Sequence, residues 1–170
     1  MKGILFTAFI LFQAIWLEVS MSLSGFVIPL LMIEMFYLTV LNKWQYAFFT
    51  ALVVCNIVDS LLGYYSLPAV TFVIIVASFW RTIGDCSKVE LQFFPVSLTV
   101  FFAQIILMIS LALKYDAVIP FKSWAYQLVG SVLFTVLLTP FIIKYQDWLA
   151  GKLKMVSYQD TQREEMYSAN

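Results

Sequence analysis

The chain has 170 residues, of which 62% are hydrophobic and 12% are charged, and its formal net charge is zero. Soluble domains average about 45–50% apolar and about 25% charged residues, and a domain of this size still leaves much of its surface outside. A soluble globule is therefore excluded, and the bilayer is the natural solvent for the excess apolar surface. The neutral balance also argues against a nucleic-acid partner.

A helix that crosses the hydrocarbon needs about 20 apolar residues. Six apolar segments approach that length, at 3–17 (extendable to 23), 26–41, 46–62, 67–80, 93–113 and 124–143. Gly63 and Pro68 are residue types that mark turns, and they lie between the third and fourth segments or at their junction. Both of these segments are short. We predict an all-α polytopic membrane domain over residues 1–150 with six transmembrane helices, five remaining possible.

The first segment has a second interpretation. Met1 and Lys2 followed by an apolar run also fit a signal peptide, with Ser20, Met21 and Ser22 as a loose cleavage site. We expect the segment to stay in place as the first span, because only further membrane segments follow it.

The basic residues predict the orientation, since Lys and Arg concentrate on the cytoplasmic side of membrane proteins. With six spans, Lys114 and Lys122 fall on one side, and eight basic residues fall on the other. These eight are Lys2, Lys43, Arg81, Lys88, Lys144, Lys152, Lys154 and Arg163. We predict a bacterial inner-membrane protein with both termini in the cytoplasm; five spans would remove this asymmetry.

Tryptophan supports the same boundaries, because its ring favours the headgroup level. All five tryptophans lie at or near a predicted span end: Trp16, Trp44, Trp80, Trp124 and Trp148. Residues 151–170 are polar and mixed in charge, which predicts a short, largely disordered cytoplasmic tail. Its first lysines would attract anionic lipid by roughly 1 kcal/mol each.

The polar side chains inside the predicted spans that matter most are Gln13, Glu34, Asn56, Asp59 and Gln104. An ionisable group within a membrane is a functional hypothesis by default, and no predicted span contains Lys or Arg. Glu34 lies deepest, so we expect it to be often protonated and to donate a hydrogen bond to another helix. A packing role and a proton or substrate site are the two interpretations.

Small and polar residues recur every four positions in the third segment, at Ala47, Ala51, Cys55, Asp59 and Gly63. Such a row forms an i±4 ridge on a helix. In lipid, small residues let helices approach closely, and polar residues bond across the contact. We therefore predict that the third segment is an interior, closely packed helix.

Asp59 lies near the end of that helix, where the negative end of the helix dipole disfavours a carboxylate. Something should compensate, and the candidates are a backbone amide in the outer loops, Asn56, Lys114 or Lys122.

Catalytic and metal-binding signatures are missing. Histidine, the commonest general base and metal ligand, does not occur. Cys55 and Cys86 lack the C-x-x-C spacing and are expected to be free thiols. The chain contains no G-x-x-x-x-G-K-[ST], H-E-x-x-H or G-x-S-x-G motif. We expect a protein that is not an enzyme and binds no cofactor or metal.

The order of features resembles the rod shape-determining protein MreD family over about residues 4–155. The resemblance begins with the span "FILFQAIW" and the second span ending at "LNKWQYA". Its centre is "ALVVCNIVDSLLGYYSLPAV", in which Asp59 is followed four residues later by Gly63 and a turn. "FWR" then leads to a loop, and "QLVGSVLFTVLLTPFIIKYQDWL" forms the last span. Ala47, Ala51 and Cys55 stand where the family usually has more glycine, and the loop "RTIGDCSKVE" is longer than usual.

The resemblance implies a non-enzymatic scaffold or regulator of side-wall peptidoglycan synthesis in the cell-elongation complex. The implied partners are MreC and, through it, MreB, RodA and the transpeptidase partner of RodA. The implied fold is similar to the six-helix membrane subunits of energy-coupling-factor transporters. Asp59 and Gly63 would set the packing of the third and fourth spans, and no small-molecule substrate is implied.

Two other functions remain open. A vitamin-capture subunit of a transporter would need an outward pocket, which Asn56, Asp59, Tyr64, Tyr65 and Trp124 could line. Such subunits usually dock through an Ala-xxx-Ala surface on the first span, whereas Ala8 and Ala14 are six residues apart. The chain could also be a membrane protein of unrelated function.

Overall fold

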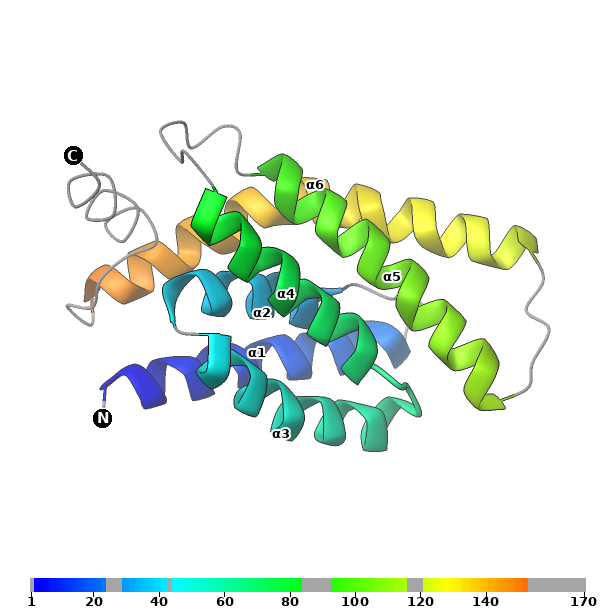
Figure 1. The fold of residues 1–170 in the computed structure, drawn as a ribbon, viewed down its shortest axis with the longest axis horizontal. Coiled ribbons are helices and arrows are strands. Elements are labelled where there is room, and N and C mark those ends of the chain that lie inside the picture. Colours follow the sequence, from blue (N-terminus) through cyan, green and yellow to red (C-terminus); the bar gives the residue numbers. More distant parts are fainter. Residues whose placement is uncertain (1, 24–28, 43, 84–92, 116–120, 153–170) are drawn as a thin grey trace.

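The computed structural model describes residues 2–23, 29–42, 44–83, 93–115 and 121–152, and these ranges contain helices and no strand. Successive helices run in opposite directions (Figure 1). Their bounds are α1 Lys2–Leu23, α2 Leu30–Leu41, α3 Trp44–Leu62, α4 Leu67–Ile83, α5 Phe93–Tyr115 and α6 Phe121–Lys152. The start of α1 and the end of α6 lie at one end of the bundle, which we call the termini end. The α3–α4 turn and the end of α5 lie at the other, the turn end.

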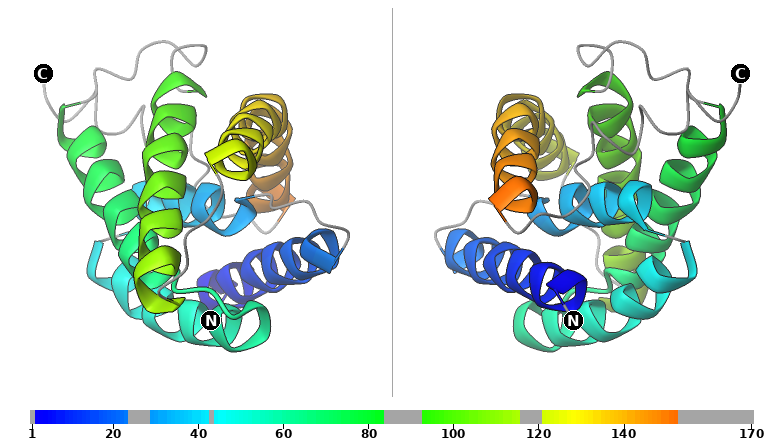
Figure 2. Two further views of the ribbon diagram at one scale, coloured as in Figure 1. Left: turned by 90° about the vertical axis from the view of Figure 1, so that its right-hand side faces the viewer. Right: turned by 90° about the vertical axis from the view of Figure 1, so that its left-hand side faces the viewer.

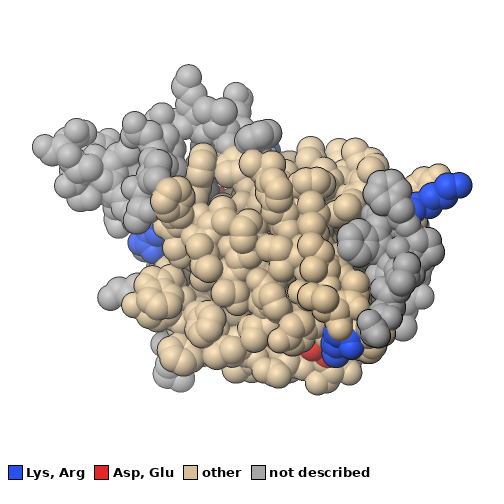
Figure 3. Space-filling model, turned by 45° about the vertical axis from the view of Figure 1, so that its right-hand side comes forward, with Lys and Arg blue, Asp and Glu red and all other residues tan. Residues whose placement is uncertain are grey.

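Four of the described helices are long and apolar enough to cross a membrane: α1, α3, α5 and α6. The helices α2 and α4 are apolar but shorter. The face in Figure 3 carries Lys and Arg at only a few places, one of them beside an acidic group, and almost all of its described surface is neither acidic nor basic. The prediction of an all-helical membrane protein is confirmed for the described residues, whereas six crossings and the likeness to transporter subunits remain predictions.

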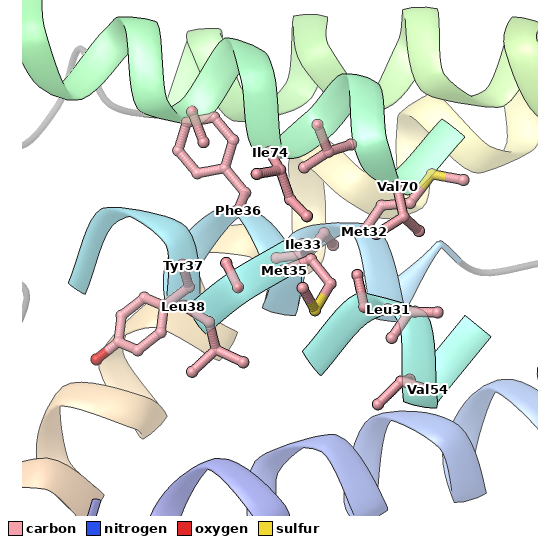
Figure 4. Close-up of a cluster of buried hydrophobic side chains, with 14 of the residues drawn as sticks. Leu31, Met32, Ile33, Met35, Phe36, Tyr37, Leu38, Val54, Val70 and Ile74 are labelled. Atoms are coloured by element: carbon pink, nitrogen blue, oxygen red, sulfur yellow. The ribbon is translucent and has the colours of Figure 1, made fainter. Parts of the chain in front are cut away.

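The second helix is the centre of the molecule. Every residue of α2 from Leu30 to Val40 is buried, and α2 contacts each of the other five helices. Phe36 and Met32 meet Ile74 and Val70 of α4, while Leu31 faces the α3 side near Val54 (Figure 4). A helix that is apolar all round belongs in an interior, and twelve residues extend only about 18 Å.

This arrangement corrects the prediction for the third segment. Ala47, Ala51 and Cys55 are buried, so the row of small residues does face the bundle. The opposite side of α3 is exposed, however, and Phe49 and Val53 have exposed fractions of 67% and 63%. The predicted interior position of the third helix is therefore wrong, and α3 lies at the periphery (Figure 2).

The structure corrects the predicted boundaries of the second and sixth helices. The predicted second helix includes Pro29, but α2 begins at Leu30, and residues 26–28 lie outside the described residues. The sixth helix was predicted to end at residue 143, but α6 continues to Lys152, which makes it about 48 Å long. Gly151 and Lys152, assigned above to a disordered tail, are therefore helical; the rest of the predicted tail lies outside the described ranges.

A polar ridge that the sequence analysis missed packs α6 against its neighbours. Ser131, Thr135 and Thr139 are buried at four-residue intervals. Thr135 donates to the carbonyl of Ser131 and Thr139 to that of Thr135. These two hydroxyls bond within α6 and not to another described helix. The contribution of the ridge to packing is therefore the small size of its side chains, which lets helices approach closely in lipid.

Three of the predicted membrane-edge tryptophans, Trp16, Trp44 and Trp148, have exposed fractions of 64%, 55% and 55%. Trp80 is half-buried, and the side chain of Trp124 lies outside the described residues. The indole of Trp148 also lies under the Lys152 ammonium, 3.9 Å from the ring centroid.

Candidate functional site

Asp59 and Gly63 build the turn between α3 and α4. The Gly63 N–H donates to the carbonyl of Asp59 at 3.0 Å, and Gly63 has a φ of +70°. Glycine adopts this left-handed conformation without the steric cost of a Cβ. Three residues later, the N–H of Ser66 donates to Asp59 Oδ1 at 2.9 Å. The carbonyl of Ser66 in turn accepts from Val70 in the first turn of α4.

The compensation expected for Asp59 is thus a backbone amide of the connecting loop. Lys114 does not serve that role, because its Nζ donates to the carbonyl of Tyr64 at 3.0 Å. The Tyr115 hydroxyl donates to the carbonyl of Gly63 at 2.6 Å. The Lys114 ammonium also lies 6.0 Å from the Tyr65 ring and 5.1 Å from the Tyr115 ring. The end of α5 is therefore attached to the α3–α4 turn.

A second carboxylate, Glu18, holds the start of α2. Glu18 is 6% exposed, and its Oε2 accepts a 2.9 Å hydrogen bond from the N–H of Leu31. The first N–H groups of a helix have no partner within it, and negative charge is favourable there. Sequence reasoning missed Glu18 because the first span was ended at residue 17; its extension to 23 would have included this carboxylate.

Tyr64 joins the end of α1 to the same turn. Its hydroxyl lies 3.3 Å from the Ser22 hydroxyl, and either oxygen can donate. Burial raises the pKa of the Tyr64 hydroxyl; the hydrogen bond with Ser22 opposes this shift, and the charge of Glu18 adds to it. We refer to Glu18, Ser22, Asp59, Gly63, Tyr64, Ser66, Lys114 and Tyr115 as the turn cluster.

The other polar cluster joins α2 to α6. Gln146 donates from Nε2 to Glu34 Oε2, and the Tyr37 hydroxyl donates to Asp147 Oδ1 at 2.9 Å. Glu34 and Gln146 have exposed fractions of 7% and 1%. Glu34 thus bonds across helices, with its carboxyl as the acceptor. The expected donation from a protonated Glu34 is not what this contact shows, since Gln146 is the donor; Gln146 Oε1 has no donor among the described residues. Gln146 was missed because it follows the predicted end of the sixth span.

The remaining polar candidates do not join these clusters. Gln104 is buried on α5, with its Nε2 3.7 Å from Met32 Sδ. Gln13 of α1 lies 3.4 Å from the Tyr145 hydroxyl of α6. Asn56 is exposed, and its Nδ2 donates to the carbonyl of Leu52 in its own helix. Asn56 therefore does not share a site with Asp59.

These contacts define what the polar residues can do. Glu18, Glu34 and Asp59 each accept a hydrogen bond from a different element. Within the described ranges, no three His, Cys, Asp or Glu side chains come close enough together to hold a metal ion. Cys55 is a buried free thiol, while Cys86 lies outside the described residues. The polar side chains that the structure brings together hold helices and helix ends in place.

Comparison with known proteins found no matching family model, curated protein or solved structure.

Proposed function

We propose that the protein is a non-enzymatic, MreD-like component of the bacterial cell-elongation complex. It lies in the inner membrane with six spans and both termini in the cytoplasm, in an arrangement similar to the membrane subunits of energy-coupling-factor transporters. It scaffolds or regulates side-wall peptidoglycan synthesis by binding an MreC-like protein. Through that partner it is linked to RodA, the transpeptidase partner of RodA, and MreB.

The proposal is supported by the position of Asp59 and Gly63, the Asp-xxx-Gly motif that is the most recognisable part of the resemblance. Asp59 and Gly63 both act within the α3–α4 turn, and the end of α5 bonds to the same turn. Such a motif shapes a surface at one end of the bundle. Exposed aromatic rings of Tyr65 and Tyr115 flank Lys114 there, which gives a docking partner both apolar and charged groups to contact.

The alternative of vitamin capture has weaker support. Two residues predicted to line the vitamin pocket, Asn56 and Asp59, lie in different environments. Asn56 is exposed, whereas Asp59 accepts a hydrogen bond from Ser66 N–H. Tyr65 is 46% exposed. Asn56 and Asp59 therefore do not face one shared pocket.

The proposal is tested by affinity capture of the MreC-like protein from the same organism, co-expressed with this chain and extracted in mild detergent. We expect the wild-type chain to retain that partner and to restore normal rod width in cells that lack their own MreD. Asp59→Leu removes the acceptor for Ser66 N–H and should weaken capture, whereas Asp59→Asn keeps an oxygen and should weaken it less.

Thermal unfolding of each variant separates loss of the partner from loss of the fold. Full capture by the folded Asp59→Leu protein would exclude a role for Asp59 in partner binding. No capture by the wild-type chain, together with no restoration of rod width, would refute the MreD-like function. A vitamin that copurifies in stoichiometric amount would favour the transporter alternative.

A further inference from the structure

One side of α3 faces away from the bundle and carries polar side chains among its apolar ones. Five exposed residues form this side, which we call the α3 stripe: Tyr46, Phe49, Val53, Asn56 and Ser60. Their spacing alternates between three and four residues, as in the seam of a left-handed helix pair. The stripe lies opposite the buried row of Ala47, Ala51 and Cys55.

Asn56 is the unusual member of the stripe. It lies six residues before the end of α3 at Leu62, about 9 Å from that end, in a helix long and apolar enough to cross a membrane. Its Nδ2 donates to Leu52 O at 2.6 Å. Among the described residues, no donor reaches Oδ1. Exposing an unpaired amide oxygen to hydrocarbon is unfavourable by several kcal/mol on transfer scales.

We propose that the α3 stripe is the contact surface for a second copy of this chain, with the two Asn56 amides paired across a two-fold axis along the membrane normal. This inference concerns self-association and does not depend on the proposed function.

Hydrogen-bond complementarity is what favours a second copy. A carboxamide carries both donors and an acceptor, and Asn56 retains one N–H and its Oδ1 for a partner. A two-fold axis along the membrane normal places the same residue of both copies at the same depth, so each amide can donate to the other. No separate partner with a matching polar group at that depth is required.

The neighbours of Asn56 allow the helices to approach. Val53 and Ser60 lie on either side of it along the stripe and are small to medium in size. Small residues at a membrane helix contact let backbones come close, and Asn hydrogen bonds across such contacts. A single Asn in a helix seam also specifies register and the number of helices, so the pairing would be specific.

The test uses the full chain, fused at its C-terminus to donor or acceptor fluorescent proteins, in phosphatidylethanolamine–phosphatidylglycerol vesicles. Energy transfer is measured over a series of protein-to-lipid ratios. We expect the wild-type chain to self-associate, and Asn56→Leu to weaken association about threefold to tenfold. Asn56→Gln keeps the amide and should retain most of the association. Ser20→Leu, a comparable change at an exposed position on α1, should have no effect.

Disulfide trapping gives an independent readout in a background of Cys55→Ala and Cys86→Ser. Val53→Cys on the stripe should form covalent dimers on oxidation in the vesicles. Ile75→Cys on α4 should not, although the two native side chains have similar exposed fractions of 63% and 62%. The proposal is overturned if the wild-type chain stays monomeric at every ratio, if Asn56→Leu associates as strongly as wild type, or if both cysteines cross-link equally.

Discussion

Asp59 Oδ1 and the backbone N–H of Ser66 are joined by a 2.9 Å hydrogen bond across the α3–α4 turn. Asp59 lies seven residues before the amide that it binds. The hydrogen bond can therefore form only when the intervening turn adopts the conformation seen here, and it stabilises that conformation. The Asp59 side chain therefore links two helices that are adjacent in sequence and antiparallel in space (Figure 1).

Replacement of Asp59 by Ala should destabilise the protein by about 1–3 kcal/mol, because it leaves the Ser66 N–H without its acceptor. Asp59→Asn should be milder, since the amide oxygen can accept the same bond. The free energy of unfolding in detergent, followed by circular dichroism, measures both variants. Equal stability of Ala and wild type would show that water replaces the carboxylate at this N–H.

Replacement of Gly63 by Ala should cost about 1–2 kcal/mol, because the left-handed conformation crowds a Cβ against the backbone. The new Cβ would also lie 3.2 Å from the Tyr115 hydroxyl. Tyr115→Phe should partly relieve this second effect, so the double variant should be more stable than the sum of the single changes predicts. Gly130→Ala is the matched control, because a Cβ there meets nothing within 4 Å. Comparable losses at both glycines would contradict this account.

Glu18→Leu should destabilise the start of α2 and lower the free energy of unfolding by about 1–3 kcal/mol, since the buried N–H of Leu31 loses its acceptor. Glu18→Gln keeps an oxygen at that position and should retain much of the stability. Hydrogen exchange at the N–H of Leu31 reports the local effect and should be faster in Glu18→Leu. An unchanged exchange rate would show that the Glu18 carboxylate does not protect this amide.

Gln146→Leu should be more harmful than the double change Glu34→Leu with Gln146→Leu. The single change leaves the buried Glu34 carboxyl unpaired, whereas apolar replacement of both partners can be nearly neutral. Unfolding of the wild type, both single variants and the double variant gives the coupling energy of the pair. Additive losses would mean that the two side chains act independently.

Glu34→Gln distinguishes the two interpretations of the same carboxyl. A packing residue needs only its hydrogen bond, which a glutamine oxygen can accept from Gln146, so we expect this variant to be stable and to restore rod width in the complementation assay. Loss of activity with unchanged stability would favour a proton or substrate site at Glu34.

The helical architecture could be predicted from composition and span length, and the turn from its residue types. The high share of apolar residues indicates a membrane protein, and Gly63 and Pro68 mark the turn between α3 and α4. The row of Ala47, Ala51 and Cys55 correctly identified the side of α3 that is buried. These features are local, because each depends on residues within one helix or at its ends.

The position of each helix in the bundle could not be predicted in this way. In lipid, an outward helix face is as apolar as an inward one, so hydropathy does not distinguish the central α2 from the peripheral α3. Glu18 and Leu31, or Glu34 and Gln146, meet only because distant helices pack side by side. Composition and residue types thus predict a helical membrane protein and the α3–α4 turn. Which helix is interior and which polar groups pair are known only from the three-dimensional structure, because those contacts depend on the packing of segments far apart in the chain.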